Sequence, residues 1–212
     1  MSNQTPQDPR FKNQTFNQES IRTYLVDYSA KLQECLNSVS QKSLEAAAEA
    51  MRTARQSGGR VFVAGNGGSA AISEHLSCDW QKGVQLDGMK SLKVNCLTSN
   101  TSLLTAIAND YGYAESFSYQ LELAEPNPND VLLLISSSGN SENIMKAASY
   151  AKTKGCKVIG FTGFSGGKLK DLADISLHIP FANYGLVEDG HQALMHVLAQ
   201  FHDIKNRESQ KL

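Results

Sequence analysis

An apolar run that ends in a cluster of serines is the stretch of this chain best suited to chemistry. Residues 132–144 read LLLISSSGNSENI, so hydroxyl side chains stand between a short apolar run and the start of a helical pattern. This arrangement brings hydroxyls and unpaired backbone N–H groups to the positive end of a helix dipole, where a phosphate monoester fits. The alternative is an ordinary turn with a serine N-cap. A cap needs one hydroxyl, however, and this loop has four: Ser136, Ser137, Ser138 and Ser141.

A second loop, GNGGS at residues 65–69, follows another short apolar run and also precedes a helical pattern. Its glycines permit a tight turn and a close approach of the backbone to a ligand. The pattern from Gly65 also fits the dinucleotide motif G-x-G-x-x-A, but that motif requires an acidic residue after the next strand. Residues 95–100 read NCLTSN there. The two loops therefore favour one small phosphorylated molecule over a dinucleotide.

Histidines and carboxylates share faces on two stretches with helical spacing. His75 and Asp79 are four residues apart, and a second stripe at this spacing consists of Glu188, Gln192 and His196. If the two helices meet, they bring together two histidines and two carboxylates, a set suited to zinc or a similar divalent ion: His75, Asp79, Glu188 and His196. For each residue alone, a solvated helix face or a packed core histidine is the simpler interpretation. The spacing does not show that the helices meet.

The scaffold that these residues need is predicted to be a parallel α/β sheet. Beyond residue 58, short apolar runs alternate with helical stretches, which predicts five strands at residues 61–64, 92–97, 131–135, 157–162 and 175–180. Connecting helices are expected at residues 69–81, 103–108, 114–123, 141–154 and 166–172, and a last helix at 187–205. Ahead of the sheet, residues 21–58 predict two helices with a break near residues 38–42.

The composition is that of a globular protein. With 212 residues, 41% of them hydrophobic and 19% charged, one domain is expected at residues 21–212, after a polar leader at residues 1–20. A net charge of −1 with scattered basic residues argues against nucleic acid and against an anionic membrane as partners. The four cysteines lack metal or redox spacing, and neither a signal peptide nor a membrane-length apolar run is present. A cytoplasmic protein with reduced cysteines is therefore expected.

Four motifs in this order resemble the sugar isomerase (SIS) domain, and within it the phosphoheptose isomerases: GNGGSAA at residues 65–71, AIANDYGY at 106–113, ISSSGNS at 135–141 and FTGFSGGKLKDLAD at 161–174. The resemblance covers nearly the whole chain after residue 20. It implies a flavodoxin-like, doubly wound sheet and a homotetramer with active sites at subunit interfaces. It also implies the conversion of sedoheptulose 7-phosphate into D-glycero-D-manno-heptose 7-phosphate.

The resemblance further implies which residues contact the substrate. The phosphate-binding serines of the family match the serine loop, with Ser137 at a position where threonine is usual, and Asn100 stands where the family often has aspartate. Contacts with the sugar or its phosphate are expected from Asn66, Gly67, Ser69, Asn100, Asn109, Asp110, Ser136, Ser137, Ser138, Ser141 and Glu188.

Catalytic and metal-binding roles are implied in the same way. His75 matches the metal-binding histidine of the family, and His196 matches a catalytic histidine that also binds metal. Asp79 stands at the catalytic glutamate, and Glu188 replaces a glutamine ligand on the last helix. One zinc ion per subunit is therefore expected, with Asp79 as base and His196 as its acid–base partner in an enediol isomerisation. A carboxylate bound to metal is a poorer base, so both roles of Asp79 stay open.

Two other functions are compatible with this resemblance. Some SIS proteins are non-catalytic tetramers that bind a protein partner such as a replication initiator, but those relatives lose the histidine and carboxylate positions that this chain retains. The other function is that of an isomerase or sensor for a different phosphosugar, because a serine loop suits any phosphate monoester. The shorter Asp79 and the uncharged Asn100 indicate a substrate related to the usual heptulose.

Overall fold

The computed structural model describes residues 16–83 and 92–209, with the side chains of residues 202–209 excepted. Most of the predicted leader at residues 1–20 therefore lies outside the described residues. Among the helices of the described part, none has the length and apolar character that crossing a membrane requires.

The first two helices are α1 (Ile21–Asn37) and α2 (Gln41–Ser57), which confirms the predicted break near residues 38–42. Ser20 caps α1 through a capping box with Thr23, and Ser40 caps α2. Gly58 ends α2 with a φ of 73°, a left-handed conformation that glycine adopts without strain. These caps explain where α1 and α2 begin and why α2 ends just before the sheet.

The sheet has five parallel strands in the order β2-β1-β3-β4-β5. Their bounds are Arg60–Gly65 for β1, Lys93–Cys96 for β2, Val131–Ser136 for β3, Lys157–Thr162 for β4 and Ile175–His178 for β5. This is the flavodoxin-like order, in which the chain reverses direction across the sheet between β1 and β3. The predicted fold class and all five predicted strands are confirmed.

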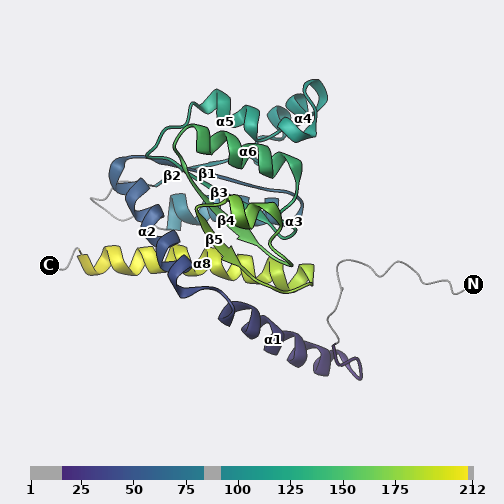
Figure 1. Cartoon of the computed structure of the whole chain (residues 1–212). Coiled ribbons are helices and arrows are strands. Elements are labelled where there is room, and N and C mark those ends of the chain that lie inside the picture. The colour runs from purple at the N-terminus through teal and green to yellow at the C-terminus, as the bar shows by residue number, and fades with distance from the viewer. Residues whose placement is uncertain (1–15, 84–91, 210–212) are drawn as a thin grey trace, which may run out of the picture.

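Helices cover both faces of the sheet, as Figure 1 shows. Beyond α1 and α2 they are α3 (Gly68–Cys78), α4 (Thr101–Asp110), α5 (Ser118–Ala124), α6 (Glu142–Thr153), α7 (Gly167–Leu172) and α8 (Tyr184–Ser209). One core lies between the sheet and α2, α3 and α8, and the other lies between the sheet and α5, α6 and α7. Strand residues alternate between the two, so Val61 and Val63 face the first core while Phe62 faces the second.

The topology brings the two polar loops to one edge. Because β1 and β3 are neighbours and parallel, the glycine loop after β1 and the serine loop after β3 both lie at the carboxyl ends of the strands. On the first face, α3 packs against α8. The helix that follows the glycine loop therefore lies beside the last helix of the chain, which the sequence alone did not show.

Candidate active site

Neighbouring segments hold the serine loop in a fixed shape. Gly139 has a φ of 65°, and its N–H donates a hydrogen bond to the Ser136 carbonyl at 3.1 Å. The Gly139 carbonyl accepts a hydrogen bond from the Leu169 N–H at 3.0 Å. A Cβ atom at Gly139 would lie 1.9 Å from the carbonyl oxygen of Gly166, so no side chain fits without a shift of the backbone. The glycine of ISSSGNS is thus required by close backbone packing.

Two hydroxyls of the serine loop do not form the hydrogen bonds that would give them a structural role. Ser137 is 4% exposed, and its Oγ has no hydrogen-bond partner among the described residues. Ser141 occupies the N-cap position of α6, but its side chain makes no capping hydrogen bond. Buried hydroxyls normally have a partner. The interpretation of this loop as a simple serine cap therefore fails on both residues.

The serine loop, the glycine loop and the start of α8 enclose a cavity of about 170 Å³. Its lining consists of Asn66, Ser69, Ile135, Ser136, Ser137, Ser138, Ser141, Tyr184 and Glu188. Six residues expected to bind the phosphate or the sugar from the two loops are thus brought together, along with Glu188. Tyr184 was not expected from the sequence. It belongs to the first turn of α8, which begins three residues before the predicted start.

A chain of hydrogen bonds fixes Asn66 at the rim of this cavity. Its side-chain amide exchanges hydrogen bonds with Asn143, at 3.0 Å and 2.9 Å, and the Tyr113 hydroxyl donates to Asn66 Oδ1 at 2.7 Å. The Asn66 side chain is thereby fixed among the residues that line the cavity. Tyr113 belongs to the AIANDYGY motif, so the motif marks a contact with the glycine loop that spacing could not reveal.

The second part of the site is a cluster of His75, Asp79 and His196, which lies between α3 and α8. One donor atom of each lies within 4.8 Å of the other two. Asp79 Oδ1 is 3.6 Å from His75 Nε2, and Asp79 Oδ2 is 3.5 Å from His196 Nε2. The two imidazole rings meet edge to face at 4.9 Å. The two helices therefore meet, which the spacing in the sequence left open.

A π-helical turn, Asp79–Gly83, begins at the cluster. π-helical turns are uncommon in proteins, and a large share of those that occur lie at functional sites. The side chains of His75, Asp79 and His196 are 49%, 31% and 37% exposed, so the cluster is open to a ligand.

Glu188 does not join this cluster, so the structure brings together three of the four residues that were predicted as metal ligands. The carboxylate of Glu188 lies over Gly68, where an added Cβ would come within 2.6 Å of Glu188 Oε2. The reason is helical geometry: residues eight apart are about 12 Å apart along the axis and about 80° apart around it. Glu188 therefore faces the serine cavity while His196 faces Asp79.

Burial raises the pKa of the Glu188 carboxyl above its usual value, and the neighbouring charge of Asp189 raises it further. A carboxylate in a cavity lined by hydroxyls can accept hydrogen bonds from a polyol. The observed position of Glu188 therefore fits its expected contact with substrate better than its expected contact with metal.

Gln192, one turn after Glu188, contacts the cluster, which Glu188 does not join. Its side-chain nitrogen lies 2.8 Å from His75 Nδ1 and 3.5 Å from His196 Nε2. The residue belongs to the stripe of three noticed in the sequence, but no role could be given to it without knowing how α8 is rotated against α3.

The remaining expected residues lie outside the cavity lining. Asn100 is the N-cap of α4, where its Oδ1 accepts a hydrogen bond from the Leu103 N–H at 3.0 Å. Asn109 and Asp110 are exposed at the end of α4 and are hydrogen-bonded to each other at 2.8 Å. Gly67 is the N-cap of α3, with a φ of 56° that favours glycine. Their contacts with substrate stay predictions.

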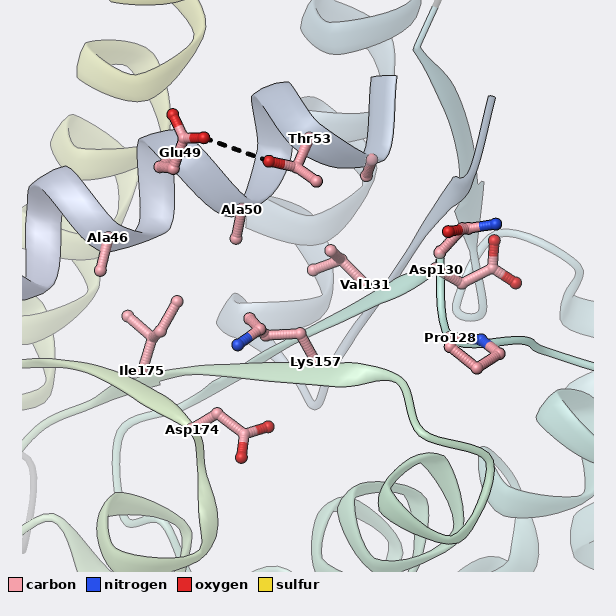
Figure 2. A pocket seen from close by; sticks show the side chains of 12 residues that line it. Ala46, Glu49, Ala50, Thr53, Pro128, Asp130, Val131, Lys157, Asp174 and Ile175 are labelled. Atoms are coloured by element: carbon pink, nitrogen blue, oxygen red, sulfur yellow. Dashed lines mark hydrogen bonds between the residues drawn. The ribbon is translucent and has the colours of Figure 1, made fainter. Parts of the chain in front are cut away.

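A larger cavity, of about 500 Å³, lies at the opposite edge of the sheet. Figure 2 shows alanines of α2 above the first residues of the strands, among them Val131, Lys157 and Ile175. Ligands of open α/β sheets bind outside the carboxyl ends of the strands, and this cavity lies at the amino ends. The carboxyl edge is therefore the candidate active site.

Comparison with known proteins agrees with the fold and the motifs. Residues 24–163 match the model of the SIS domain. A phosphoheptose isomerase from Rhodospirillum rubrum is 36% identical over 184 residues, which covers 85% of this chain and 94% of the relative. The structure of a phosphoheptose isomerase from Neisseria gonorrhoeae superposes with a TM-score of 0.78 at 30% identity, covering 87% of this chain and 99% of that one.

A phosphoheptose isomerase structure from Francisella tularensis gives a TM-score of 0.79 at 32% identity, covering 86% and 96% of the two chains. These likenesses extend over nearly the full length of each relative, and the SIS-domain match at residues 24–163 includes both loops. The chain therefore belongs to the SIS-domain family and, within it, to the phosphoheptose isomerases.

Proposed function

We propose that this chain isomerises D-sedoheptulose 7-phosphate to D-glycero-D-manno-heptose 7-phosphate. The observation that supports the proposal best is that α8 contributes residues to both parts of the site. Its first turns line the serine cavity with Tyr184 and Glu188, and two turns later it supplies His196 to the cluster with Asp79. The eight-residue step from Glu188 to His196 corresponds to about 12 Å along the helix axis. One extended sugar phosphate along α8 therefore reaches both parts of the site. Membership in the phosphoheptose isomerases favours the heptulose as this sugar.

The phosphate is assigned to the serine cavity. Ser137 offers a hydroxyl without a partner among the described residues, Ser141 offers one that does not cap α6, and Asn66 adds its side-chain amide to the lining. Hydrogen bonds to a charged acceptor are stronger than neutral ones, which compensates for the burial of the Ser137 hydroxyl. Glu188, which lines the cavity from α8, is assigned to the sugar hydroxyls, from which its carboxylate accepts hydrogen bonds.

The reaction moves one proton between neighbouring carbons. The Asp79 carboxylate takes a proton from C1 of the ketose, and His196 gives a proton to the carbonyl oxygen on C2, which forms an enediol. A proton then returns to C2 while the C1 hydroxyl loses its own, and this leaves the aldose. Asp79 gives its proton back at C2 and His196 takes the C1 hydroxyl proton, so both groups return to their starting protonation states. The 3.5 Å distance between His196 Nε2 and Asp79 Oδ2 places the two groups together at the reacting carbons.

His75, Asp79 and His196 also have the donor chemistry of a zinc site, and we assign one ion per chain to them. An atom that holds the ion is not available for proton transfer, so the roles of Asp79 and His196 as base and acid apply to the cluster without the ion, and the metal-free and zinc-loaded samples below distinguish the two roles. Ligands about 2.1 Å from a tetrahedral ion lie about 3.4 Å apart. The Asp79 oxygens lie 3.6 Å and 3.5 Å from the two imidazole nitrogens, which fits this spacing. A bound ion would polarise the substrate carbonyl and stabilise negative charge on the substrate oxygens.

The experiment is proton exchange in deuterated water, followed by NMR of sedoheptulose 7-phosphate with metal-free and zinc-loaded protein. Deuterium at C1 of the ketose together with formation of the aldose is the expected result. Asp79→Asn is expected to abolish the exchange, so full exchange by this variant would remove Asp79 from the role of base. No exchange by either form of the wild-type protein would favour another phosphosugar or a non-catalytic SIS protein.

We also propose a homotetramer, the assembly that the family resemblance implies. Helix α1 extends from the rest of the chain along α8 (Figure 1), and it exposes Ile21, Leu25 and Val26 by 85%, 60% and 62%. Neighbouring exposed apolar side chains on one helix are typical of a surface that another subunit covers. Light scattering is expected to give four times the chain mass, and Leu25→Gln is expected to reduce it.

A further inference from the structure

Gln192 connects the two histidines of the cluster through a single side-chain amide. Its nitrogen lies 2.8 Å from Nδ1 of His75, while Nε2 of the same ring faces Asp79 Oδ1 at 3.6 Å. The second contact, to His196 Nε2, is longer at 3.5 Å. Among the described residues, no other hydrogen bond to His75 Nδ1 is formed. The amide of Gln192 therefore alone controls the ring nitrogen that does not face the cluster.

The orientation of this amide decides which nitrogen of His75 carries the proton. A neutral imidazole has one N–H and one lone pair. When the Gln192 nitrogen donates to Nδ1, the proton of His75 must be on Nε2, and the lone pair needed by a cation is absent from the side of Asp79. Rotation of the amide by half a turn places its oxygen at Nδ1. The oxygen then accepts the Nδ1 proton, and the Nε2 lone pair points into the cluster.

We propose that Gln192 is a positioning residue that selects the tautomer of His75, and that its amide turns over when a divalent cation binds to His75, Asp79 and His196. The inference rests on the proposed cation site. Its general basis is that a metal-binding histidine usually donates its other N–H to a fixed acceptor, which orients the ring. The two amide orientations occupy the same space, so the turn requires no other movement of α8.

Gln192→Leu is the variant that tests the proposal, because it keeps the approximate size and removes both the donor and the acceptor. Zinc affinity is measured by competition with a chromophoric chelator. A loss of about tenfold or more is expected, in line with the effect of removing such partners in other metal sites. Gln192→Glu keeps an acceptor and is expected to restore the affinity. Gln200→Leu, the same change at an exposed position one turn beyond His196, is the matched control and is expected to leave the affinity unchanged.

Long-range ¹H–¹⁵N spectra of histidine-labelled protein provide a readout apart from affinity. In the metal-free protein, the His75 signals are expected to show a proton on Nε2, and zinc is expected to move the proton to Nδ1. In Gln192→Leu, the metal-free ring is expected to average between the two tautomers. His75→Gln assigns the signals.

The outcomes separate this inference from the proposed function. Equal zinc affinity and unchanged His75 signals in Gln192→Leu would overturn the role of Gln192 and leave the cation site intact. A wild-type protein that binds no zinc at the cluster would overturn the cation site and this inference with it. The assignment of the isomerase reaction is decided independently, by the exchange experiment.

Discussion

The two edges of the sheet differ in whether the polar groups around their cavities already have partners within the protein. At the carboxyl edge, the cavity is small, about 170 Å³, yet the Ser137 hydroxyl has no partner among the described residues and the histidine cluster is open. At the amino edge, the cavity is about 500 Å³, but its acidic groups are already paired within the protein. An unpaired hydroxyl that lines the cavity and an open histidine cluster beside it, and not the volume of a cavity, therefore distinguish the candidate site.

Asp130 is an example of an acidic group at the amino edge that is paired within the protein. Its side chain is fully buried, and it accepts hydrogen bonds from the Arg60 backbone at 2.7 Å and from the Arg60 guanidinium at 2.7 Å and 3.2 Å. Asn127 donates two more, at 3.0 Å and 3.1 Å. This network joins the start of β1 to the turn before β3. Its task is to hold two central strands together.

The comparison predicts that changes at the carboxyl edge remove activity and leave stability unchanged. His196→Ala is expected to lower kcat about 10³-fold, because the acid–base partner is lost. Its thermal midpoint is expected to stay near that of the wild type, since His196 is 37% exposed. Turnover of sedoheptulose 7-phosphate and thermal unfolding are measured on the same samples. An inactive variant that also unfolds early would break the distinction between the edges.

The amino edge is expected to behave in the opposite way. Asp130→Ala leaves the partly buried Arg60 guanidinium without its carboxylate partner, with only the Ala124 and Glu125 carbonyls as acceptors, and the free energy of unfolding is expected to fall by about 3 kcal/mol. Urea unfolding measures this change, and kcat and KM at a temperature where the variant is folded are expected to match the wild type. Asp171→Ala, at an exposed position, is the control and is expected to change stability by at most about 0.5 kcal/mol.

His191 belongs to neither edge and tests whether the core sets the acid limit of stability. It is fully buried next to Phe161, and burial lowers its pKa from 6.5 to about 4. The unfolded chain therefore binds more protons between these values, so stability falls as pH drops from 6.5 towards 4, by about 3 kcal/mol in all. His191→Met is expected to lack this part of the pH dependence in urea unfolding. An identical slope in the variant would exclude His191 as its source.

A smaller effect is expected from the unpaired hydroxyls. Ser137→Ala is expected to raise KM about tenfold, because a hydrogen bond to the phosphate is lost, and to leave the ligand-free protein as stable or slightly more stable. Ser176 in β5 offers the matched control, since its buried Oγ also has no partner among the described residues but lies outside the cavity. Ser176→Ala is expected to leave KM unchanged. A rise in KM for both variants would contradict the assignment of the phosphate to the serine loop.

The sequence predicted the strands and both loops because these depend on local patterns. A buried apolar run followed by GNGGS or SSSGNS defines a strand, its carboxyl end and the start of a helix, and the parallel order then brings the two loops together. Ser137 shows the same logic at the level of one residue. A fourth hydroxyl beyond what a cap needs was a sequence signal, and the structure leaves that hydroxyl unpaired.

The histidine cluster was predicted less completely because it depends on how two helices are rotated against each other. His75 and Asp79 share a face at any rotation, and His196 meets them because α3 packs on α8. Which subsite Glu188 and Gln192 face depends on how α8 is rotated about its axis relative to α3. Each step of four residues turns a side chain about 40° around the helix, so a stripe in the sequence divides between two subsites. Tyr184 and Tyr113 also depend on tertiary contacts that no spacing reveals.

Because α8 runs without interruption past both subsites, it fixes the distance between them. An α-helix does not stretch, so the separation between the seat of the phosphate and the acid–base pair is set by the number of residues between Tyr184 and His196. A ketose phosphate with fewer carbons can occupy the serine cavity without placing its carbonyl beside Asp79. Such a molecule is expected to occupy the site without reacting, so the length of the sugar, more than its stereochemistry, would separate substrates from inhibitors.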